Sequence, residues 1–187
     1  INDFKVFPSI VVWVPFNEAW GQFDTPAAVK LTRKLDPTRL INSDSGGNFD
    51  FSEGPEGFGD ILDVHHYPCP AMNLFESTFV NVLGEYGGIG LPVDGHTWII
   101  DRKWGYGGNK KDSEEVMTQY ETFLEMLKMF VQTGCAAAVY TQTTDVEGEV
   151  NGLITYDRKV IKVDMPRIAR GNQSVIKSMP AKEIKKK

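Results

Sequence analysis

The sequence has few cysteines, no excess of basic residues and no apolar run long enough to span a bilayer. Its two cysteines, Cys69 and Cys135, lack the CxxC or Cys/His spacing of a zinc site, so we expect buried or free thiols, with one disulfide left open. A formal net charge of −5 over 187 residues argues against a general nucleic-acid binder, whose phosphate contacts need a basic face. The charge also gives no reason to expect a membrane surface as a partner.

No signal peptide is visible, but the chain starts at Ile1 without a methionine, so this absence says nothing about export. The cellular location stays open, and a periplasmic or secreted location is compatible with the sequence. The hydrophobic content of 41% suffices for a sizeable core, so we expect residues 1–169 to form one domain or part of one. Residues 170–187, which end in three lysines, are interpreted as a polar, solvated tail.

Apolar, β-branched runs alternate with helical patterns along the chain. Such runs are typical of strands buried on both faces of a parallel sheet, and the alternation predicts parallel βαβ units. The strand candidates are residues 9–15, 39–43, 61–65, 80–85 and 135–141. The helix candidates are residues 24–35, a weak one at 71–77, and 112–134, and residues 87–111 are expected to form a long loop.

Polar or aromatic residues gather at the C-terminal end of each predicted strand. This is the edge where parallel α/β sheets and barrels carry their active sites. Glu18 and Glu85 each end an apolar strand, where desolvation favours the neutral acid. Two carboxylates facing one cavity can divide the roles of proton donor and nucleophile. The alternative is that each glutamate caps a loop or pairs with an arginine.

Three further polar residues are candidate substrate contacts. Asn17 precedes Glu18 and could bind a substrate hydroxyl, although a turn-forming asparagine is the alternative. His65 and Tyr67 lie two residues apart, so on a strand they face the same side, where they could bind sugar hydroxyls or orient a carboxylate. A structural, hydrogen-bonded histidine is equally compatible with the spacing. His66 would point to the opposite face, so we do not predict a metal site.

Aromatic residues offer candidate surfaces for sugar rings. Trp98 and Trp104 lie in the long loop after Glu85, where a binding role is more credible than in a strand. Tyr140 lies near the end of the last predicted strand and is a third candidate.

Four segments resemble, in order, the barrel of family 2 glycoside hydrolases, the β-galactosidase, β-glucuronidase and β-mannosidase group. Residues 13–22 resemble the acid/base motif of strand four, and residues 63–68 resemble the strand-six segment. Residues 84–88 resemble the nucleophile motif of strand seven, and residues 140–153 resemble the end of strand eight. The segments read WVPFNEAWGQ, DVHHYP, GEYGG and YTQTTDVEGEVNGL.

The resemblance implies a (β/α)8 TIM barrel of which this chain holds strands four to eight, retaining stereochemistry and no cofactor. It implies that Glu18 is the general acid/base, that Glu85 is the nucleophile, and that Asn17 contacts the sugar 2-hydroxyl. Tyr67 is expected near the nucleophile, and Tyr140 occupies a position where the family often has a tryptophan. The barrel's first three strands and its β-sandwich domains are then expected in the same polypeptide, unless self-association covers the open edges.

The expected function is hydrolysis of a β-glycosidic bond, with a carbohydrate as the partner and neither nucleic acid nor membrane involved. A non-catalytic carbohydrate-binding barrel fragment is the first alternative. An α/β domain with purely structural carboxylates is the second.

Overall fold

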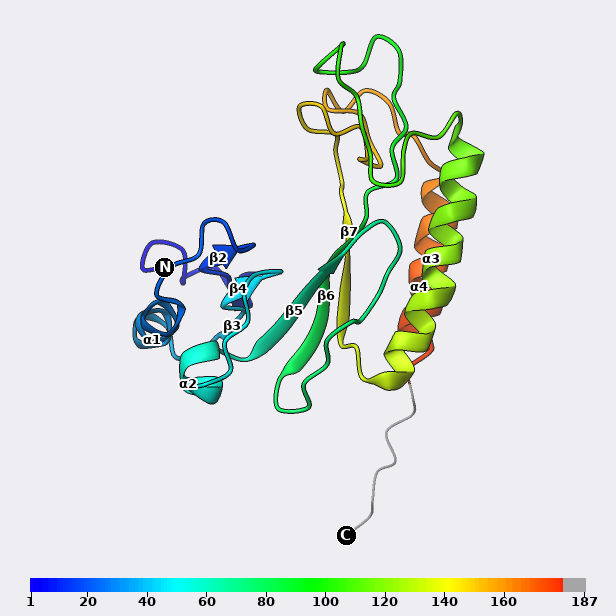
Figure 1. Cartoon of the computed structure of the whole chain (residues 1–187). Helices are drawn as coiled ribbons and strands as arrows, with labels where there is room; N and C mark the ends of the chain where they lie inside the picture. The colour runs from blue at the N-terminus through cyan, green and yellow to red at the C-terminus, as the bar shows by residue number, and fades with distance from the viewer. Residues whose placement is uncertain (180–187) are drawn as a thin grey trace. The chain divides into compact units, whose positions relative to one another are not determined.

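The computed structural model describes residues 1–179 and has a mixed α/β fold (Figure 1). Its helices are α1 (Thr25–Leu35), α2 (Gly54–Phe58), α3 (Ser113–Thr133) and α4 (Met165–Lys177). Its strands are β1 (Val12–Trp13), β2 (Phe16–Asn17), β3 (Leu40–Ile41), β4 (Asp44–Ser45), β5 (Ile61–His66), β6 (Val80–Gly87) and β7 (Ala137–Thr141). All five predicted strand regions therefore contain strands, although the first two are shorter than expected.

The chain forms two compact units. Unit 1 comprises residues 1–65 and 72–84, and unit 2 comprises residues 66–71 and those from 85 onward.

A parallel ladder organises the first half of unit 1. Strand β1 pairs with β3 and β2 pairs with β4, and in both pairs the partner lies 28 residues further along the chain, as in Val12 with Leu40 and Phe16 with Asp44. The unchanged offset means that the two short sheets are one ladder with an interruption. Pro15 lies at that interruption, and a proline has no N–H to donate to a ladder.

Helix α1 connects the paired segments and leaves one of its apolar side chains exposed. Pro26 lies in its first turn, and the Asp24 side chain makes no capping hydrogen bond. The buried residues are Thr25, Val29 and Thr32, whereas Leu31 is 57% exposed. The face of α1 that carries Leu31 is therefore largely exposed within residues 1–179.

Aromatic packing forms the core of unit 1. Phe58, Leu62 and Phe79 are buried together, with Phe49 and Leu74 packed against them. The Phe58 and Phe79 rings lie 4.6 Å apart between centroids. Helix α2, which carries Phe58, is too short to give a sequence signal of its own and was not predicted.

The weak helix predicted at residues 71–77 is absent. The Asn81 side chain accepts a hydrogen bond from the Glu76 backbone N–H at 2.9 Å. It also donates to the carbonyl oxygens of Glu76 and Phe79. These backbone groups are therefore satisfied by a side chain in a non-helical conformation.

Helix α3 in unit 2 agrees closely with its prediction. The Asp112 carboxylate accepts a hydrogen bond from the Glu115 backbone at 2.9 Å and caps the helix. Gly134 ends the helix in the left-handed region, with a φ of 108° that glycine adopts without strain. Its buried stripe includes Val116, Tyr120, Phe123 and Leu127.

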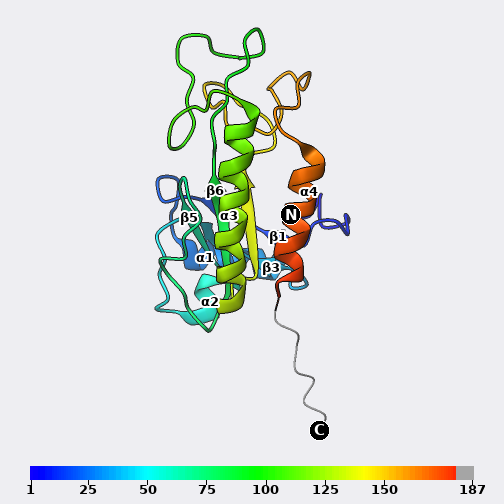
Figure 2. The same cartoon turned by 90° about the vertical axis from the view of Figure 1, so that its right-hand side faces the viewer.

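Residues 170–177 belong to helix α4, so the predicted polar tail begins inside a helix. Helices α3 and α4 lie side by side (Figures 1 and 2). Arg167 forms ion pairs with Glu114 and Glu121, both at 2.8 Å, and Tyr120 donates to Asn172 at 3.0 Å. Ion pairing thus docks a segment whose polar sequence resembles a tail, while residues 180–187 lie outside the described part.

A buried ion pair fixes the loops after β6 and β7 in unit 2. The Lys162 ammonium donates to the Asp145 carboxylate at 2.7 Å, and to the carbonyl oxygens of Leu91 and Val150. Burial lowers the pKa of Lys162 and raises the pKa of Asp145, and their mutual contact opposes both shifts. Removing one partner would leave the other buried charge uncompensated, so these loops are held firmly together.

The assigned strands of residues 1–179 form sheets of two, two and three strands, the last in the order β5-β6-β7. The mixed α/β class with parallel pairing is therefore confirmed, and no closed barrel is formed by the described residues. None of the helices in residues 1–179 is both long and apolar enough to cross a membrane.

The aromatic core predicts a large effect of truncating Phe58, which is 1% exposed. We expect Phe58→Ala to lower the free energy of unfolding by about 3–5 kcal/mol, because it leaves a cavity among packed rings. Phe75→Ala, at a side chain that is 49% exposed, is the control and should cost less than about 1 kcal/mol. Denaturant unfolding followed by circular dichroism measures both values, and equal losses would contradict this core.

Candidate active site

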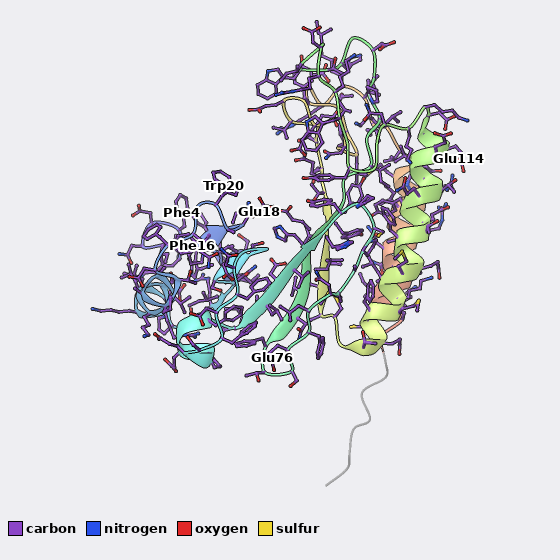
Figure 3. The ribbon with its side chains drawn as sticks, viewed as in Figure 1. Phe4, Phe16, Glu18, Trp20, Glu76 and Glu114 are labelled. Carbon is purple, nitrogen blue, oxygen red and sulfur yellow. The ribbon has the colours of Figure 1, made fainter. Side chains whose placement is uncertain are left out.

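Glu18 lies at the C-terminal end of the unit 1 ladder. Its backbone N–H donates to the Ser45 carbonyl at 2.7 Å, which extends the β2–β4 pairing by one residue. Its φ of 58° is in the left-handed region, which is uncommon for a residue with a side chain. The Trp20 indole donates to the Glu18 carboxylate at 3.3 Å, and the two side chains lie close together (Figure 3).

A chain of polar contacts leads from Glu18 to the buried Asp63 carboxylate, all within unit 1. Glu18 Oε1 lies 3.5 Å from His65 Nδ1, and His65 Nε2 lies 2.9 Å from the Ser45 hydroxyl. The Ser45 hydroxyl donates to Asp63 Oδ2 at 2.7 Å, and the Asn42 amide donates to the same oxygen at 2.7 Å. A buried carboxylate therefore anchors the chain, while the Glu18 side chain is 42% exposed.

The hydrogen bonds of the Ser45 hydroxyl indicate which ring nitrogen of His65 donates to it. A serine has one proton, and here it goes to Asp63, so the contact with His65 Nε2 requires that nitrogen to be the donor. The opposite nitrogen, Nδ1, then carries a proton only when the imidazole is charged. A hydrogen bond between His65 and Glu18 therefore needs one proton, held either by the imidazole or by the carboxyl group.

Two glycines make room for this chain of contacts. A Cβ on Gly84 would lie 2.0 Å from Asp63 Oδ1, so β6 can pass the carboxylate only at a glycine. A Cβ on Gly46 would lie 2.3 Å from the His65 ring, and Gly46 has a φ of 66°. At these two positions glycine therefore leaves space for the Asp63 and His65 side chains.

Asn17 lies beside Glu18 on β2 and pairs with Ser45 through the backbone ladder. Its side chain is exposed and makes no hydrogen bond within residues 1–179. The exposed amide remains able to bind a ligand. The alternative, a side-chain contact that forms a turn, is not present in the described residues.

Glu85 lies on β6 in unit 2 and is held by Tyr67. The Tyr67 hydroxyl donates to Glu85 Oε2 at 2.5 Å and also lies 2.6 Å from the Thr141 hydroxyl. A phenol has one proton, which goes to Glu85, so Thr141 is the donor in the second contact. The proximity of Tyr67 to Glu85, which the family resemblance implies, is present in the structure.

The environment of Tyr67 keeps it protonated. Burial raises the pKa of its hydroxyl above the usual range, and the hydrogen bond to Glu85 raises the pKa further. The Tyr67 ring also stacks on Tyr106, with centroids 3.7 Å apart and planes 11° apart. The phenol is therefore a fixed donor to the Glu85 carboxylate over the physiological pH range.

The predicted aromatic residues of unit 2 occupy three separate settings. Tyr140 faces Tyr86 and Tyr120 in an apolar groove of about 520 Å³, on the side of the sheet opposite Thr141. Trp98 is 58% exposed and packs only at an angle against Tyr156. Trp104 is edge-on to Tyr106, which stacks on Tyr67, so Trp104 is connected through two rings to Glu85.

Several residues of the two clusters were missed in the sequence. Ser45, Asp63 and Asn42 support His65, while Thr141 and Tyr106 support Tyr67. Asp63 had a usable signal, because a charged residue inside an apolar strand needs a buried partner. Tyr106 had none, because its stacking partner is 39 residues away and lies outside any periodic element.

Asp44 adds a titratable group behind the ladder in unit 1. It is buried and accepts hydrogen bonds from the Ser43 hydroxyl at 2.7 Å and the Gln22 amide at 2.9 Å. Burial raises the pKa of Asp44 from 3.8 to about 6, and these two hydrogen bonds oppose the shift.

The raised pKa of Asp44 predicts a pH dependence of stability. Because the folded protein disfavours the charged form, the free energy of unfolding should fall as the pH rises from about 4 to about 6. Asp44→Asn should remove this part of the dependence, since the amide is neutral throughout. Exposed Asp3→Asn is the matched control, and denaturant titrations at several pH values give the comparison. An unchanged slope in Asp44→Asn would contradict the buried, raised-pKa carboxyl.

Comparison of the chain with protein-family models and with curated proteins gives no match.

Proposed function

We propose that this chain is part of a retaining glycoside hydrolase that cleaves a β-glycosidic bond by double displacement. Glu85 is the nucleophile and Glu18 is the general acid/base, as the resemblance to family 2 glycoside hydrolases implies. No cofactor takes part in this chemistry, because the two carboxyl groups supply both the nucleophile and the proton.

The observation that carries the proposal is the hydrogen bond from Tyr67 to Glu85. A nucleophilic carboxylate must be held in place beside the sugar, and the Tyr67 hydroxyl donates to Glu85 Oε2 at 2.5 Å. The same hydrogen bond aims the carboxylate, and the Thr141 and Tyr106 contacts aim the phenol in turn. A carboxylate that served only as a loop cap would not need a donor that is itself held by two further side chains.

The surroundings of Glu18 support the acid/base role. A general acid must hold a proton, give it to the leaving group and recover it. His65 Nδ1 lies 3.5 Å from Glu18 Oε1, so the imidazole is placed to exchange a proton with the carboxyl group, and Ser45 and Asp63 fix the orientation of the imidazole. The half-exposed Glu18 carboxyl is also open to a substrate from the solvent side.

The proposed barrel assignment follows the parallel ladder. In this assignment β1 and β2 are strand four, β3 and β4 are strand five, and β5, β6 and β7 are strands six to eight. The constant 28-residue offset supports joining the short strands, and Glu18 and Thr141 each lie at a C-terminal strand end. The remaining strands are proposed to come from the same polypeptide or from a second copy.

The nucleophile assignment predicts chemical rescue of a Glu85 variant. Glu85→Ala should lower hydrolysis of aryl β-glycosides by several orders of magnitude, because no glycosyl-enzyme forms. Azide can enter the vacated space, so it should restore turnover and yield a glycosyl azide of inverted anomeric configuration. Glu76→Ala, on a surface loop, is the control. Normal turnover by Glu85→Ala would refute the assignment.

The acid/base assignment predicts a dependence on the leaving group. Glu18→Ala should slow substrates with poor leaving groups far more than activated aryl glycosides, because only the former need a proton in the transition state. Comparing kcat/KM over a series of aryl glycosides measures the effect, with Glu56→Ala as a surface control. An equal loss over the whole series would indicate that Glu18 only positions the substrate.

The competing proposal is a carbohydrate-binding protein without turnover, which the exposed Trp104 and Trp20 side chains would also suit. Binding of sugars without hydrolysis of any aryl glycoside, tested on the longest polypeptide that contains the chain, would favour it. Hydrolysis that depends on Glu85 would exclude it.

A further inference from the structure

An aromatic surface extends from the Glu85 cluster toward solvent in unit 2. The Tyr67 ring stacks on Tyr106, and Tyr106 meets the Trp104 ring edge-on at 5.2 Å and 75°. Trp104 is 39% exposed, so part of its ring is accessible. Exposed indole faces bind the C–H faces of sugar rings, and this one is two rings away from a proposed nucleophile.

A carboxylate accompanies the exposed indole. The backbone N–H of Trp104 donates to the Gly148 carbonyl, and the backbone N–H of Val150 donates to the Trp104 carbonyl, both at 2.9 Å. Trp104 and Glu149 therefore pair as neighbours in a parallel bridge, where paired side chains stand on the same face. The indole and the Glu149 carboxylate thus belong to one surface.

Amide groups fix the Glu149 carboxylate in one orientation. Glu149 Oε2 accepts hydrogen bonds from the Gln142 amide at 3.1 Å and from the Asn151 amide at 3.0 Å. Gln142 also donates to Asn151 at 2.8 Å, and Asn151 is fully buried. The second oxygen, Glu149 Oε1, has no hydrogen-bond partner among the described residues, and Glu149 is only partly buried.

Glu149, Gln142 and Asn151 are connected to the proposed nucleophile through neighbouring residues. Gln142 directly follows Thr141, whose hydroxyl contacts Tyr67, and Tyr67 in turn holds Glu85. The Lys162 ammonium, bound to Asp145 and to the Val150 carbonyl, keeps the loop that carries Glu149 in place. Two routes, one aromatic and one polar, therefore connect Glu149 with Glu85 on rigid supports.

We propose that Trp104 and Glu149 form a sugar subsite beside Glu85 that selects a neutral, hydroxyl-rich sugar over a uronic acid. The indole stacks on the sugar ring, and Glu149 Oε1 accepts hydrogen bonds from hydroxyl groups, which charged acceptors bind strongly. The same oxygen repels a uronate carboxylate, so discrimination arises from a repulsive contact as well as an attractive one. This inference rests on the proposed hydrolase function and names its substrate class.

The test compares aryl β-glycosides of neutral hexoses with the aryl β-glucuronide, using Glu149→Gln in the longest polypeptide that contains the chain. Glutamine keeps an acceptor for Gln142 and Asn151 and removes the charge. We expect KM for the preferred neutral substrate to rise about tenfold or more with little change in kcat, since binding in the ground and transition states is lost equally. The preference over the glucuronide should narrow. Trp104→Phe should raise KM for the neutral substrate as well.

Glu147→Gln is the matched control, because it makes the same charge change two residues away at an exposed side chain. It should leave KM and the substrate preference unchanged. Hydrolysis with equal KM and equal preference in Glu149→Gln and Glu147→Gln would overturn the subsite and leave the hydrolase proposal intact. If the unmodified protein hydrolyses no member of the panel, the hydrolase proposal fails. Titration of the methyl β-glycosides by NMR then decides the subsite, which fails too unless Glu149→Gln weakens binding of a neutral sugar.

Discussion

Parallel pairing of short strands is the constraint on which both clusters depend. Parallel strands end at the same edge, so the residues that follow them meet there. In unit 1 the ladder of β1 and β2 with β3 and β4 ends at Glu18 and Ser45, and the Gly46 N–H continues to the Asp63 carbonyl on β5. Polar side chains far apart in the sequence thereby come within hydrogen-bonding distance, although the strands themselves are apolar.

Each supporting hydroxyl group has a single proton, and this fixes which atom donates in each hydrogen bond of the two clusters. The Ser45 hydroxyl and the Tyr67 hydroxyl each have one proton, and each donates it to a carboxylate. In unit 1 this leaves His65 as donor to Ser45 and makes its other nitrogen a proton partner for Glu18. In unit 2 Tyr67 is the donor to Glu85, and Thr141 is the donor to Tyr67. The two glutamates thus have different surroundings, as the proposed division between acid/base and nucleophile would require.

The sequence predicted the elements whose pattern is local and missed contacts made over long distances. Helix α3 was predicted closely because its cap, its buried stripe and its terminal glycine all lie within one segment. Helix α4 was missed because Arg167 docks a polar segment through ion pairs that no periodicity reveals. The position of Glu18 at a strand end was predictable, whereas Glu85 lies inside β6, which continues past the predicted end to Gly87. The packing of Tyr140 away from Thr141 follows from the alternation of side chains along a strand.

The central claim is that Glu85 becomes covalently bonded to the sugar, and trapping that intermediate tests it most directly. A 2-deoxy-2-fluoro glycoside with an activated leaving group slows the hydrolysis of a glycosyl-enzyme, so the intermediate accumulates. Mass spectrometry of the digested protein should then find the label on the peptide that contains Glu85, and on its carboxylate. A label on Glu18 or another residue, or an active enzyme that acquires no label, would contradict the account.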